Sequence, residues 1–456
     1  MRPELVRAVV VEVYEQVRRE GALADRALER VLRRERKSLH SVERRQSADV
    51  VYGLLRLQGR IDWLLSRAVE QAEKRTLDRL ATPTQHLLRF AAYLVLGEGR
   101  TPAEALTFGG AEVRPHAQAL ELLAHPEGLP WPEDPLDRLA AQTSLPRWLA
   151  ALWMNELGED GARKLAEALN ERAPLTIRAN LLKGTRDELV AKLAAEGIAA
   201  TPTKLSPWGA SIESRTNARA LTAFKQGLFE VQDEGSQLIA LACAARPGQT
   251  VVDACAGAGG KALALAAEMH NKGKLLACDR DGRRLEELKL RARRAGAHNF
   301  KLLAAPEGKE GDARLLPELG KHDVVLVDAP CSGLGALRRN PDARWRLTAA
   351  EVATFPPRQA EILERYSALV KPGGRLVYAT CSVNRAENEA IADGFAAAHP
   401  EFSFEAPESY LGAELARALG AGPRGVQLLP HVHGTDGFYF ASFVRAGDLS
   451  PTGRQA

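Results

Sequence analysis

Two cysteines of this 456-residue chain stand where a buried strand is expected to end. Cys331 lies in the segment Asp-Ala-Pro-Cys-Ser-Gly (328–333), after the apolar run 324–327. Cys381 lies in Thr-Cys-Ser, after the run 375–378. In an open parallel sheet, the carboxyl ends of the strands form the edge where ligands and chemistry collect. A thiol there can act as a nucleophile, and two thiols on neighbouring strands can serve one substrate.

The other three cysteines give weaker indications. Cys243 and Cys278 lie inside apolar stretches, and each is predicted to be a small buried core residue. Cys255 lies in a glycine-rich turn, where it can line a pocket. Five widely spaced cysteines, with no Cys-x-x-Cys pair, predict neither a disulfide framework nor a structural zinc site. The thiols are therefore expected to be reduced and available for chemistry.

The glycine-rich turn follows the strand expected at 250–254 and opens a helix rich in Ala and Leu. Glycine lets the backbone approach a ligand closely. Asp279 ends the next expected strand, a position from which an acid accepts hydrogen bonds from ribose hydroxyls. A Walker phosphate loop would need glycine in place of Cys255 and Ser or Thr in place of Ala262. The residues predicted to form a cofactor loop are Cys255, Ala256, Gly257, Ala258, Gly259, Gly260 and Lys261.

The charge beside this turn indicates which ligand it takes. Asp253 directly precedes the turn, where it disfavours a pyrophosphate and suits a cationic group. S-adenosylmethionine carries an ammonium, a sulfonium and an adenosine ribose but no phosphate, so it fits this pattern better than NAD does. Two alternatives stay open: a tight strand–helix turn that binds nothing, and a nucleotide-dependent oxidoreductase.

A thiol beside S-adenosylmethionine permits methylation of a pyrimidine. Carbon-5 of the ring is a poor nucleophile, but addition of a thiolate to carbon-6 gives an enamine whose carbon-5 attacks the sulfonium methyl. Loss of the carbon-5 proton and elimination of the thiol complete the reaction. Asp328, three residues before Cys331, is the candidate for a hydrogen bond to ring nitrogen-3 as charge develops there. Lys261, Arg338 and Arg339 are candidate sources of the positive potential that activates a thiol.

With these two cysteine motifs, in this order and after this loop, the chain resembles the RNA cytosine-5 methyltransferases of the Sun/NOL1/NOP2 superfamily. The resemblance covers most of 145–445. It implies that Cys381 is the nucleophile and that Cys331 assists release of the methylated product. The further segments that carry it are 229–237, 311–314, 339–345 and 434–438.

The same resemblance implies that S-adenosylmethionine contacts the loop 255–261 together with Asp279, Asp312 and Asp328, and that Asp312 faces the adenine amino group. The loop of that family usually reads Cys-Ala-Ala/Ser-Pro-Gly-Gly-Lys-Thr. Here Gly257 and Ala258 replace the small residue and the proline, and Ala262 replaces the threonine. The loop is therefore expected to be less rigid, with weaker cofactor affinity.

The front end, in segments 43–56 and 61–65, resembles the NusB transcription antitermination factor, which has an RNA-binding helical fold. A NusB-like front end joined to this catalytic domain resembles the bacterial small-subunit ribosomal RNA cytosine-5 methyltransferase B subfamily. Small-subunit rRNA is therefore the expected substrate, and tRNA is the alternative within the same class. A non-catalytic RNA-binding assembly factor is the competing function of another class, which intact Cys331 and Cys381 disfavour.

Three domains are predicted. Residues 1–140 carry apolar residues at helical spacing and form an all-α, NusB-like RNA-binding domain. Residues 145–235 form a small α+β domain for RNA binding or linkage, after a proline-rich segment, 128–135, that is expected to be a linker or boundary. Residues 236–446 alternate strands and helices and form a doubly wound α/β, Rossmann-like methyltransferase domain.

Individual elements follow from local patterns. Helix starts are expected at Thr82, at Thr101 with Glu104, and at Thr185 with Glu188, the last as a capping box. His431 and His433 alternate on a stretch expected to be extended, and we assign them to a surface loop rather than a metal site. The expected strands are 175–180, 250–254, 274–279, 300–304, 323–328, 375–380 and 438–444.

The composition is that of a soluble globular protein, with 45% hydrophobic and 26% charged residues and a net charge of +4. No run is long enough for a membrane span, and the first residues lack the apolar stretch of a signal peptide. A cytoplasmic monomer that binds RNA and no metal is therefore expected. The candidate RNA contacts are Arg338, Arg339 and Arg344, beside Trp345, although a solvated loop explains them as well. The target base is expected to be extruded or already unpaired.

Overall fold

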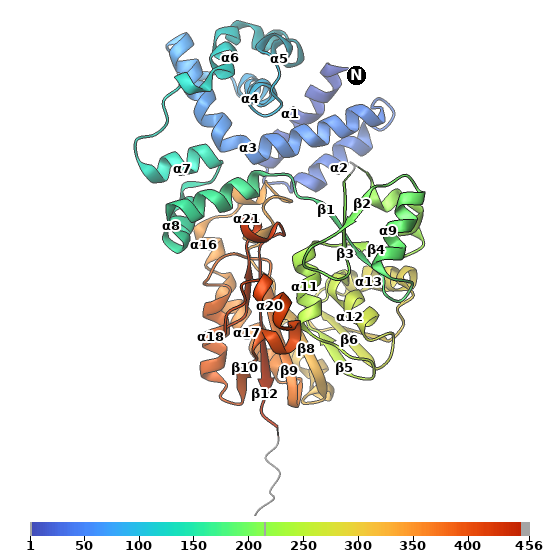
Figure 1. Cartoon of the computed structure of the whole chain (residues 1–456). Coiled ribbons are helices and arrows are strands. Elements are labelled where there is room, and N and C mark those ends of the chain that lie inside the picture. Colours follow the sequence, from blue (N-terminus) through green and yellow to red (C-terminus); the bar gives the residue numbers. More distant parts are fainter. Residues whose placement is uncertain (1, 214–215, 448–456) are drawn as a thin grey trace, which may run out of the picture. The chain divides into compact units, whose positions relative to one another are not determined.

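The computed structural model describes residues 2–213 and 216–447, and its packing divides the chain into two compact units (Figure 1). The helical unit comprises residues 1–172 together with 337–350. Among the described residues, the sheet unit comprises those in 173–336 and 351–447. The segment 337–350, which follows the first cysteine motif in the sequence, therefore packs with the helices at the other end of the chain.

Amphipathic helices build the helical unit, whose members are α1 (Pro3–Arg19), α2 (Ala24–Arg34), α3 (Ser41–Glu73), α4 (Thr82–Leu96), α5 (Pro102–Gly109), α6 (Ala117–Ala124), α7 (Pro135–Thr143), α8 (Arg147–Asn170) and α15 (Ala343–Arg346). The long helix α3 packs against α1, α4, α6 and α7. Apolar side chains at helical spacing, such as Val10, Val50 and Leu64, are fully buried in one core. The all-helical prediction for this part of the chain is confirmed.

Local signals set the helix starts as predicted. α4 begins at Thr82. Thr101 caps α5, because its hydroxyl accepts a hydrogen bond from the Glu104 backbone while the Glu104 carboxylate accepts one from the Thr101 backbone at 2.9 Å. The proline-rich segment 128–135 lies inside the helical unit instead of bounding it. Its prolines interrupt helix locally, but Leu129 is buried in the same core and keeps the segment packed.

The sheet unit opens with a small antiparallel sheet of strand order β2-β3-β1-β4. Its elements are β1 (Leu175–Ala179), α9 (Arg186–Ala195), β2 (Ala200–Pro202), β3 (Gly209–Ile212), α10 (Thr222–Lys225) and β4 (Phe229–Val231). Thr185 and Glu188 form the predicted capping box of α9. Ile177, Leu189 and Phe229 are buried in a core of their own. The predicted small α+β fold is confirmed.

A second sheet has the order β10-β12-β9-β8-β5-β6-β7, with β11 paired to β12. Its strands are β5 (Thr250–Asp253), β6 (Lys274–Asp279), β7 (Phe300–Ala304), β8 (His322–Asp328), β9 (Val370–Thr380), β10 (Phe402–Phe404), β11 (Val426–Leu428) and β12 (Phe438–Arg445). The adjacent strands β9, β8, β5, β6 and β7 are parallel to one another, and β12 runs antiparallel to β9. Chain order reverses between β5 and β8, which is where open α/β sheets bind ligands.

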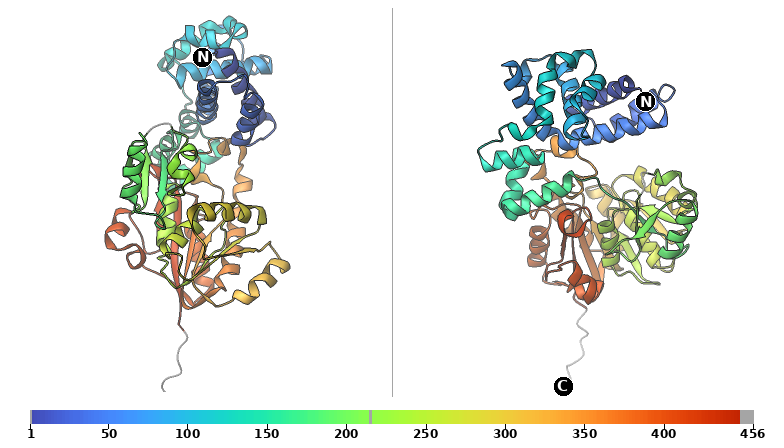
Figure 2. Two further views of the ribbon diagram at one scale, coloured as in Figure 1. Left: turned by 90° about the vertical axis from the view of Figure 1, so that its right-hand side faces the viewer. Right: turned by 45° about the horizontal axis from the view of Figure 1, so that its top comes forward.

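Helices cover both faces of this sheet (Figures 1 and 2). One core joins Val251 and Leu326 to α11 (Glu234–Ala242), α12 (Gly260–Glu268) and α13 (Gly282–Ala295). The other joins Val252 and Val325 to α17 (Phe355–Ser367) and α18 (Glu389–Ala398). Successive strand residues point to opposite faces, so the apolar runs serve both cores. The doubly wound prediction is confirmed.

The predicted extended stretch around His431 and His433 is wrong. Pro430 starts one helical turn there, α21 (Pro430–His433), because proline suits the first position of a helix. The Nδ1 atom of His433 accepts a hydrogen bond from the Leu429 backbone at 2.9 Å. Within residues 2–213 and 216–447, no helix has the length and apolar character needed to cross a membrane.

Candidate active site

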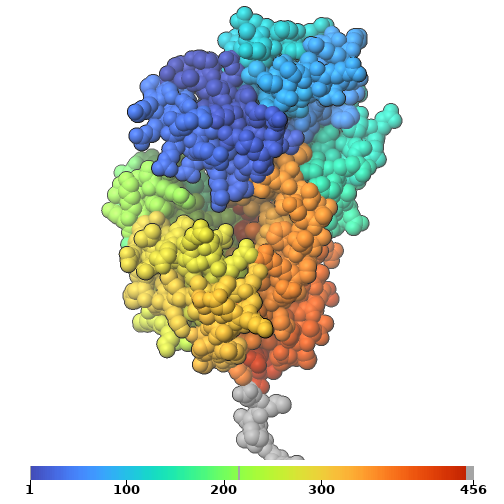
Figure 3. Space-filling view, turned by 180° about the vertical axis from the view of Figure 1, so that it is seen from behind, coloured from blue at the N-terminus to red at the C-terminus, as the bar shows by residue number. Residues whose placement is uncertain are grey.

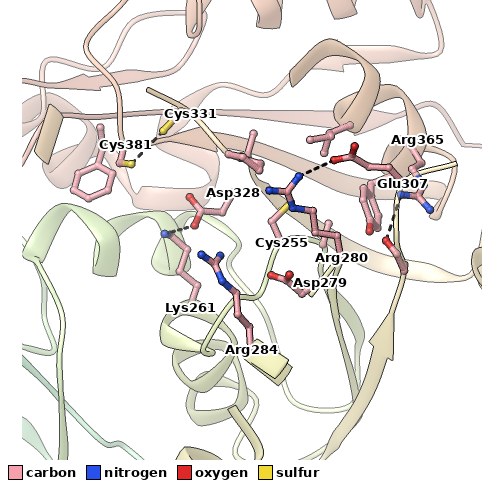
Figure 4. A pocket seen from close by; sticks show the side chains of 17 residues that line it. Cys255, Lys261, Asp279, Arg280, Arg284, Glu307, Asp328, Cys331, Arg365 and Cys381 are labelled. Carbon is pink, nitrogen blue, oxygen red and sulfur yellow. Dashed lines mark hydrogen bonds and ion pairs between the residues drawn. The ribbon is translucent and has the colours of Figure 1, made fainter. Parts of the chain in front are cut away.

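The carboxyl ends of β5, β6, β8 and β9 surround a cavity of about 550 Å³ in the sheet unit (Figure 4). The two halves of the sheet unit that enclose it lie side by side in Figure 3, with residues 280–307 in yellow and residues near 360 in orange. The cavity is lined by Ala254, Cys255, Lys261, Asp279, Arg280, Arg284, Ala305, Glu307, Asp328, Ala329, Pro330, Cys331, Ile362, Arg365, Tyr366, Cys381 and Phe438.

The two predicted cysteines meet at this cavity. Cys331 follows β8 and Cys381 follows β9, and their Sγ atoms lie 3.1 Å apart. Pairing of the two strands continues past their ends, because the Ala329 N–H donates to the Ala379 carbonyl at 2.8 Å and the Gly335 N–H donates to the Cys381 carbonyl at 3.0 Å. The expectation that both thiols lie at one edge, on neighbouring strands, is confirmed.

The contact with Cys381 affects the protonation of Cys331. The hydrogen bond to Cys381, together with burial, raises the pKa of Cys331 well above its usual range. Cys331 therefore keeps its proton at neutral pH, and its sulfur lies within hydrogen-bonding distance of the Cys381 sulfur. Burial disfavours the charge of Lys261, but attraction to Asp328 outweighs burial and raises the pKa of the ammonium. A thiolate at Cys381 adds to that attraction.

Asp328 ends β8 and pairs with Lys261, whose Nζ lies 2.6 Å from its Oδ2 (Figure 4). Lys261 is nearly buried, whereas 26% of the Asp328 side chain is exposed. The carboxylate thus anchors the lysine while one side of it faces the cavity. The structure brings Asp328 and Lys261 together with both cysteines, as the sequence indicated.

Asp279 holds the glycine-rich loop against the end of β6. Its Oδ2 accepts a hydrogen bond from the Gly257 backbone, and its Oδ1 accepts one from the Asp281 backbone, both at 2.8 Å. Gly257 and Gly259 have φ values of 53° and 87°, a left-handed conformation that favours glycine. At Gly259 a Cβ would also lie 2.6 Å from the Leu288 side chain, so this position admits no larger residue without rearrangement.

Asp253 lies at the end of β5 and is 1% exposed. Burial, and then repulsion by Asp328, raises the pKa of Asp253 to about 7. Asp253 is not among the lining residues, whereas the next two residues, Ala254 and Cys255, line the cavity. The acid expected to face a cationic ligand therefore lies behind the cavity wall.

Two arginines outside the loop hold its backbone. The Arg291 guanidinium donates to the Ala258 carbonyl at 2.7 Å and to Glu230 at 2.9 Å. The buried Arg178 guanidinium donates to the Gly260 carbonyl at 2.7 Å. Arg178 and Glu230 come from the small sheet, so that sheet braces the cofactor loop. The sequence of the loop gives no indication of these contacts, because both arginines lie outside it.

Asp312 lies in α14 (Lys309–Leu315), with 55% of its side chain exposed, and pairs with Arg365 at 2.7 Å. Arg365 lines the cavity, but Asp312 does not. Glu307, in the loop before α14, lines it instead and pairs with Arg280 at 3.1 Å. The sequence prediction missed these three lining residues, although Arg280 and Glu307 closely follow the ends of β6 and β7.

The structure corrects one predicted RNA contact. Arg344 is fully buried in the helical unit, where it donates to the Ser144 and Leu169 carbonyls, each at 3.2 Å, and to Asn170 Oδ1 at 2.7 Å. Burial, and then repulsion by Arg56, lowers the pKa of Arg344 to about 9. A guanidinium enclosed by protein acceptors is an internal anchor and does not bind RNA phosphate.

The other two arginines differ in exposure. Arg338 is 4% exposed, and Arg339 is partly exposed. Their role as RNA contacts stays a prediction.

The remaining cysteines lie as predicted. Cys243 and Cys278 are fully buried core residues, and burial raises the pKa of each thiol. Cys255 lines the cavity, and burial raises its pKa well above the usual range, so it stays a neutral thiol. Across the described part of the chain, no three His, Cys, Asp or Glu side chains are grouped so that they could hold a metal ion.

Comparison with known proteins agrees with this site. Residues 240–444 match the family described as 16S rRNA methyltransferase RsmB/F, residues 145–219 match its ferredoxin-like domain, and residues 4–107 match the NusB family. A Synechocystis protein named "Probable ribosomal RNA small subunit methyltransferase B" is 31% identical over 95% of this chain and 98% of its own length. A Bacillus subtilis protein of the same name is 30% identical over 98% of this chain and all of its own.

The chain belongs to the 16S rRNA methyltransferase RsmB/F family. It is thus an S-adenosylmethionine-dependent rRNA methyltransferase with a NusB-like front end and a ferredoxin-like middle domain. The limits predicted for its domains, at 140, 145, 235 and 446, stay predictions.

Solved structures repeat the RsmB/F architecture. The crystal structure of PH0851 superposes with a TM-score of 0.73 at 26% identity and covers 97% of this chain and 99% of its own. A methyltransferase homologue from Pyrococcus horikoshii has a TM-score of 0.57 at 27% identity, over 69% of this chain and 99% of its own. NSun6 from the same organism, solved with the S-adenosylmethionine analogue SFG, is 22% identical with a TM-score of 0.57 and shares the fold.

The cavity of this RsmB/F protein has the chemistry that S-adenosylmethionine requires. Its volume of about 550 Å³ is in the range of small-molecule sites. Asp279 presents a carboxylate for ribose hydroxyls at the end of β6, and Tyr366 and Ile362 offer apolar surface for a base. Lys261 and Arg284 offer cations for a carboxylate. The residues present therefore fit the cofactor.

Proposed function

We propose that this protein methylates carbon-5 of a cytosine in small-subunit rRNA through a covalent thiol adduct. One observation carries the proposal: two thiols lie 3.1 Å apart on the wall of a nucleoside-sized cavity in a chain of the RsmB/F family. A single thiol serves many purposes, but two in contact at the same opening suit a reaction that forms a carbon–sulfur bond and then breaks it.

In this mechanism Cys381 is the nucleophile. Its thiolate adds to carbon-6 of the ring, and Lys261 stabilises the negative charge before attack. The Asp328 carboxylate, held by Lys261, takes a proton from water and then donates a hydrogen bond to ring nitrogen-3 as negative charge develops there. When bound, S-adenosylmethionine supplies the electrophilic methyl group that carbon-5 accepts.

Cys331 acts at the release step. The carbon-5 proton is lost to water, the bond between carbon-6 and the Cys381 sulfur breaks, and the electron pair of that bond returns to the sulfur. The raised pKa of Cys331 keeps its proton available, so its S–H stabilises the departing thiolate. The loop 255–261, Asp279, Asp312 and Asp328 are the proposed cofactor contacts. Of these, Asp312 has the weaker support because it lies outside the cavity lining.

The choice of rRNA over tRNA rests on the NusB-like residues 4–107 and on the relatives named for the small ribosomal subunit. A cytosine inside an RNA helix cannot be reached by the thiol, so we propose that the target base is extruded or unpaired when bound.

The monomeric state of the protein stays a prediction.

Transfer of a tritiated methyl group tests the proposal. The purified chain is incubated with labelled S-adenosylmethionine and either small-subunit rRNA or tRNA, and bisulfite sequencing then locates any 5-methylcytosine. We expect label in rRNA only, at a cytosine, and no label with Cys381→Ser. Label at another base or atom would contradict the cytosine carbon-5 assignment. Cofactor binding without transfer to any RNA would favour the non-catalytic assembly factor.

A further inference from the structure

Glu387 is a fully buried carboxylate just before α18 in the sheet unit, and it is not among the residues that line the cavity. It binds the residue that follows each cysteine. The Ser332 backbone N–H donates to it at 2.8 Å, and the Ser332 hydroxyl donates as well. The Ser382 hydroxyl donates to it at 2.8 Å. One carboxylate therefore bridges the loops that carry Cys331 and Cys381.

Two amides complete the shell around Glu387. Gln359 donates to it at 3.0 Å from α17, and Asn384 donates at 3.3 Å. The same Gln359 amide also donates to the Pro330 carbonyl at 3.0 Å. Cys331 is thus held on both sides, through Pro330 and through Ser332. A buried carboxylate is unfavourable unless several donors satisfy it, and here five do so.

Asn388 extends the same clamp to the second loop. Its Oδ1 accepts from the Thr380 hydroxyl at 2.6 Å, and its Nδ2 donates to the Ser382 carbonyl at 3.0 Å. Cys381 lies between these two anchored residues. Glu387 and Asn388, together with Gln359 from α17, therefore hold each thiol by the residues on either side of it.

We infer that Glu387 is a positioning residue that sets the spacing between the two thiols. The chemical importance of that spacing rests on the proposed function, in which one sulfur bonds carbon-6 while the other assists its departure. A misplacement of about 1 Å in such a pair reduces turnover by roughly a hundredfold. The distance itself can be measured without any RNA.

Glu387→Gln is the first test, with Glu389→Gln as the matched control. Glutamine keeps the size of the side chain but turns an NH₂ group toward hydroxyl and amide donors. Glu389 lies in the first turn of α18, and within the described residues no hydrogen bond joins it to either cysteine loop. We expect kcat to fall by at least tenfold in Glu387→Gln, with Kd for S-adenosylmethionine changed by less than twofold. Glu389→Gln should match the unsubstituted protein.

Phenylarsine oxide gives a second readout that is independent of catalysis. It condenses with two thiols, forming two As–S bonds and releasing one water, and it binds tightly only when both thiols can reach one arsenic. We expect the unsubstituted protein and Glu389→Gln to bind it tightly through Cys331 and Cys381, and Glu387→Gln to bind it at least tenfold more weakly. Ser382→Ala is the second variant, in case Glu387→Gln does not fold. It removes the Ser382 hydroxyl that donates to Glu387, and we expect a smaller loss of arsenical affinity.

The outcomes separate the two proposals. Tight arsenical binding and unchanged kcat in folded Glu387→Gln would overturn the positioning role, as would an unchanged Ser382→Ala where Glu387→Gln does not fold. Weakened arsenical binding in a protein that methylates no RNA would support the positioning role and contradict the proposed function.

Discussion

At the scale of single residues, the proposed mechanism needs one thiol that keeps its proton beside another that acts as the nucleophile. Contact with Cys381 and burial both keep Cys331 protonated, while the Lys261–Asp328 pair places a fixed cation at the same opening. The two cysteines are therefore not interchangeable. Substituting each one should stop the reaction at a different step.

Cys331→Ala should trap the reaction after the carbon–sulfur bond has formed. Attack by Cys381 needs no proton from Cys331, whereas release loses the S–H that stabilises the departing sulfur. We expect turnover to fall at least a hundredfold and a covalent RNA–protein band to accumulate on a denaturing gel. The band should be absent in Cys331→Ala/Cys381→Ser. Normal turnover without any adduct would contradict the role given to Cys331.

Asp253→Asn should stabilise the protein near neutral pH when no cofactor is bound. The pKa of Asp253 is about 7 in the folded chain, against 3.8 for a free side chain, so the folded state holds a proton that the unfolded state releases above pH 4. Stability from this group is therefore lost between about pH 4 and pH 7 and is constant above. Asparagine has no proton to release, so Asp253→Asn avoids this loss of stability. A pKa difference of one unit corresponds to about 1.4 kcal/mol, so the rise from 3.8 to about 7 costs at most about 4 kcal/mol.

Thermal unfolding from pH 4 to pH 8 measures this effect. The Tm of Asp253→Asn should exceed that of the unsubstituted protein at pH 8, and the difference should shrink toward pH 4. Asp187, whose side chain is 83% exposed, gives the control variant Asp187→Asn. A constant difference at every pH would show that the carboxyl does not titrate as described.

At the scale of elements, the cofactor loop gets its rigidity from its neighbours. The family proline is replaced by Ala258, which predicted a looser loop, but Arg291 holds the Ala258 carbonyl and Arg178 holds the Gly260 carbonyl. Asp279 holds the Gly257 backbone from the end of β6. Three side chains from outside the loop thus fix its backbone, which offsets the missing ring constraint.

Arg291→Met should weaken cofactor binding without unfolding the sheet unit. The Ala258 carbonyl loses its donor and Glu230 loses one of its two arginine partners, Arg294 being the other. We expect Kd for S-adenosylmethionine to rise about tenfold, which corresponds to about 1.4 kcal/mol. Isothermal titration calorimetry measures it, with Lys289→Met on the exposed face of α13 as the control. Equal affinity in both variants would show that the brace is not needed.

Long apolar strands were predictable, and so was the edge where they end. The bounds of β6 and β7 agree with the prediction, and those of β8 and β9 differ only at their starts. The short strands β2, β3, β4, β10 and β11 were missed, because three or four residues carry too little periodicity. Gln359, in α17, and Glu387, in the loop before α18, were missed because a polar residue gives no sign in the sequence that it is buried.

At the scale of the whole molecule, one segment packs with a part of the chain that is distant from it in the sequence. Residues 337–350 lie in sequence between the two cysteine motifs, yet they pack within the helical unit. Trp345 donates to the Leu55 carbonyl at 2.7 Å, and Arg344 lies buried beside it. Basic residues next to a tryptophan indicated an RNA surface, and the same residue types serve here as an anchor. The anchored segment is therefore part of the helical unit, although it lies in sequence between Cys331 and Cys381.

Arg344→Ala should release this anchor and destabilise the helical unit, which carries the proposed RNA-binding domain. Three buried acceptors lose their donor and a cavity is left, so we expect the helical unit to lose about 3 kcal/mol of stability. Cofactor affinity should stay unchanged because the cavity lies in the sheet unit, while kcat/KM for rRNA should fall at least tenfold. Calorimetric unfolding, cofactor titration and methyl transfer measure the three quantities. Arg19→Ala, which removes one exposed ion pair to Glu15 in the same unit, is the control and should lose less than 1 kcal/mol. Loss of cofactor binding together with rRNA methylation would show instead that Arg344 supports the whole fold.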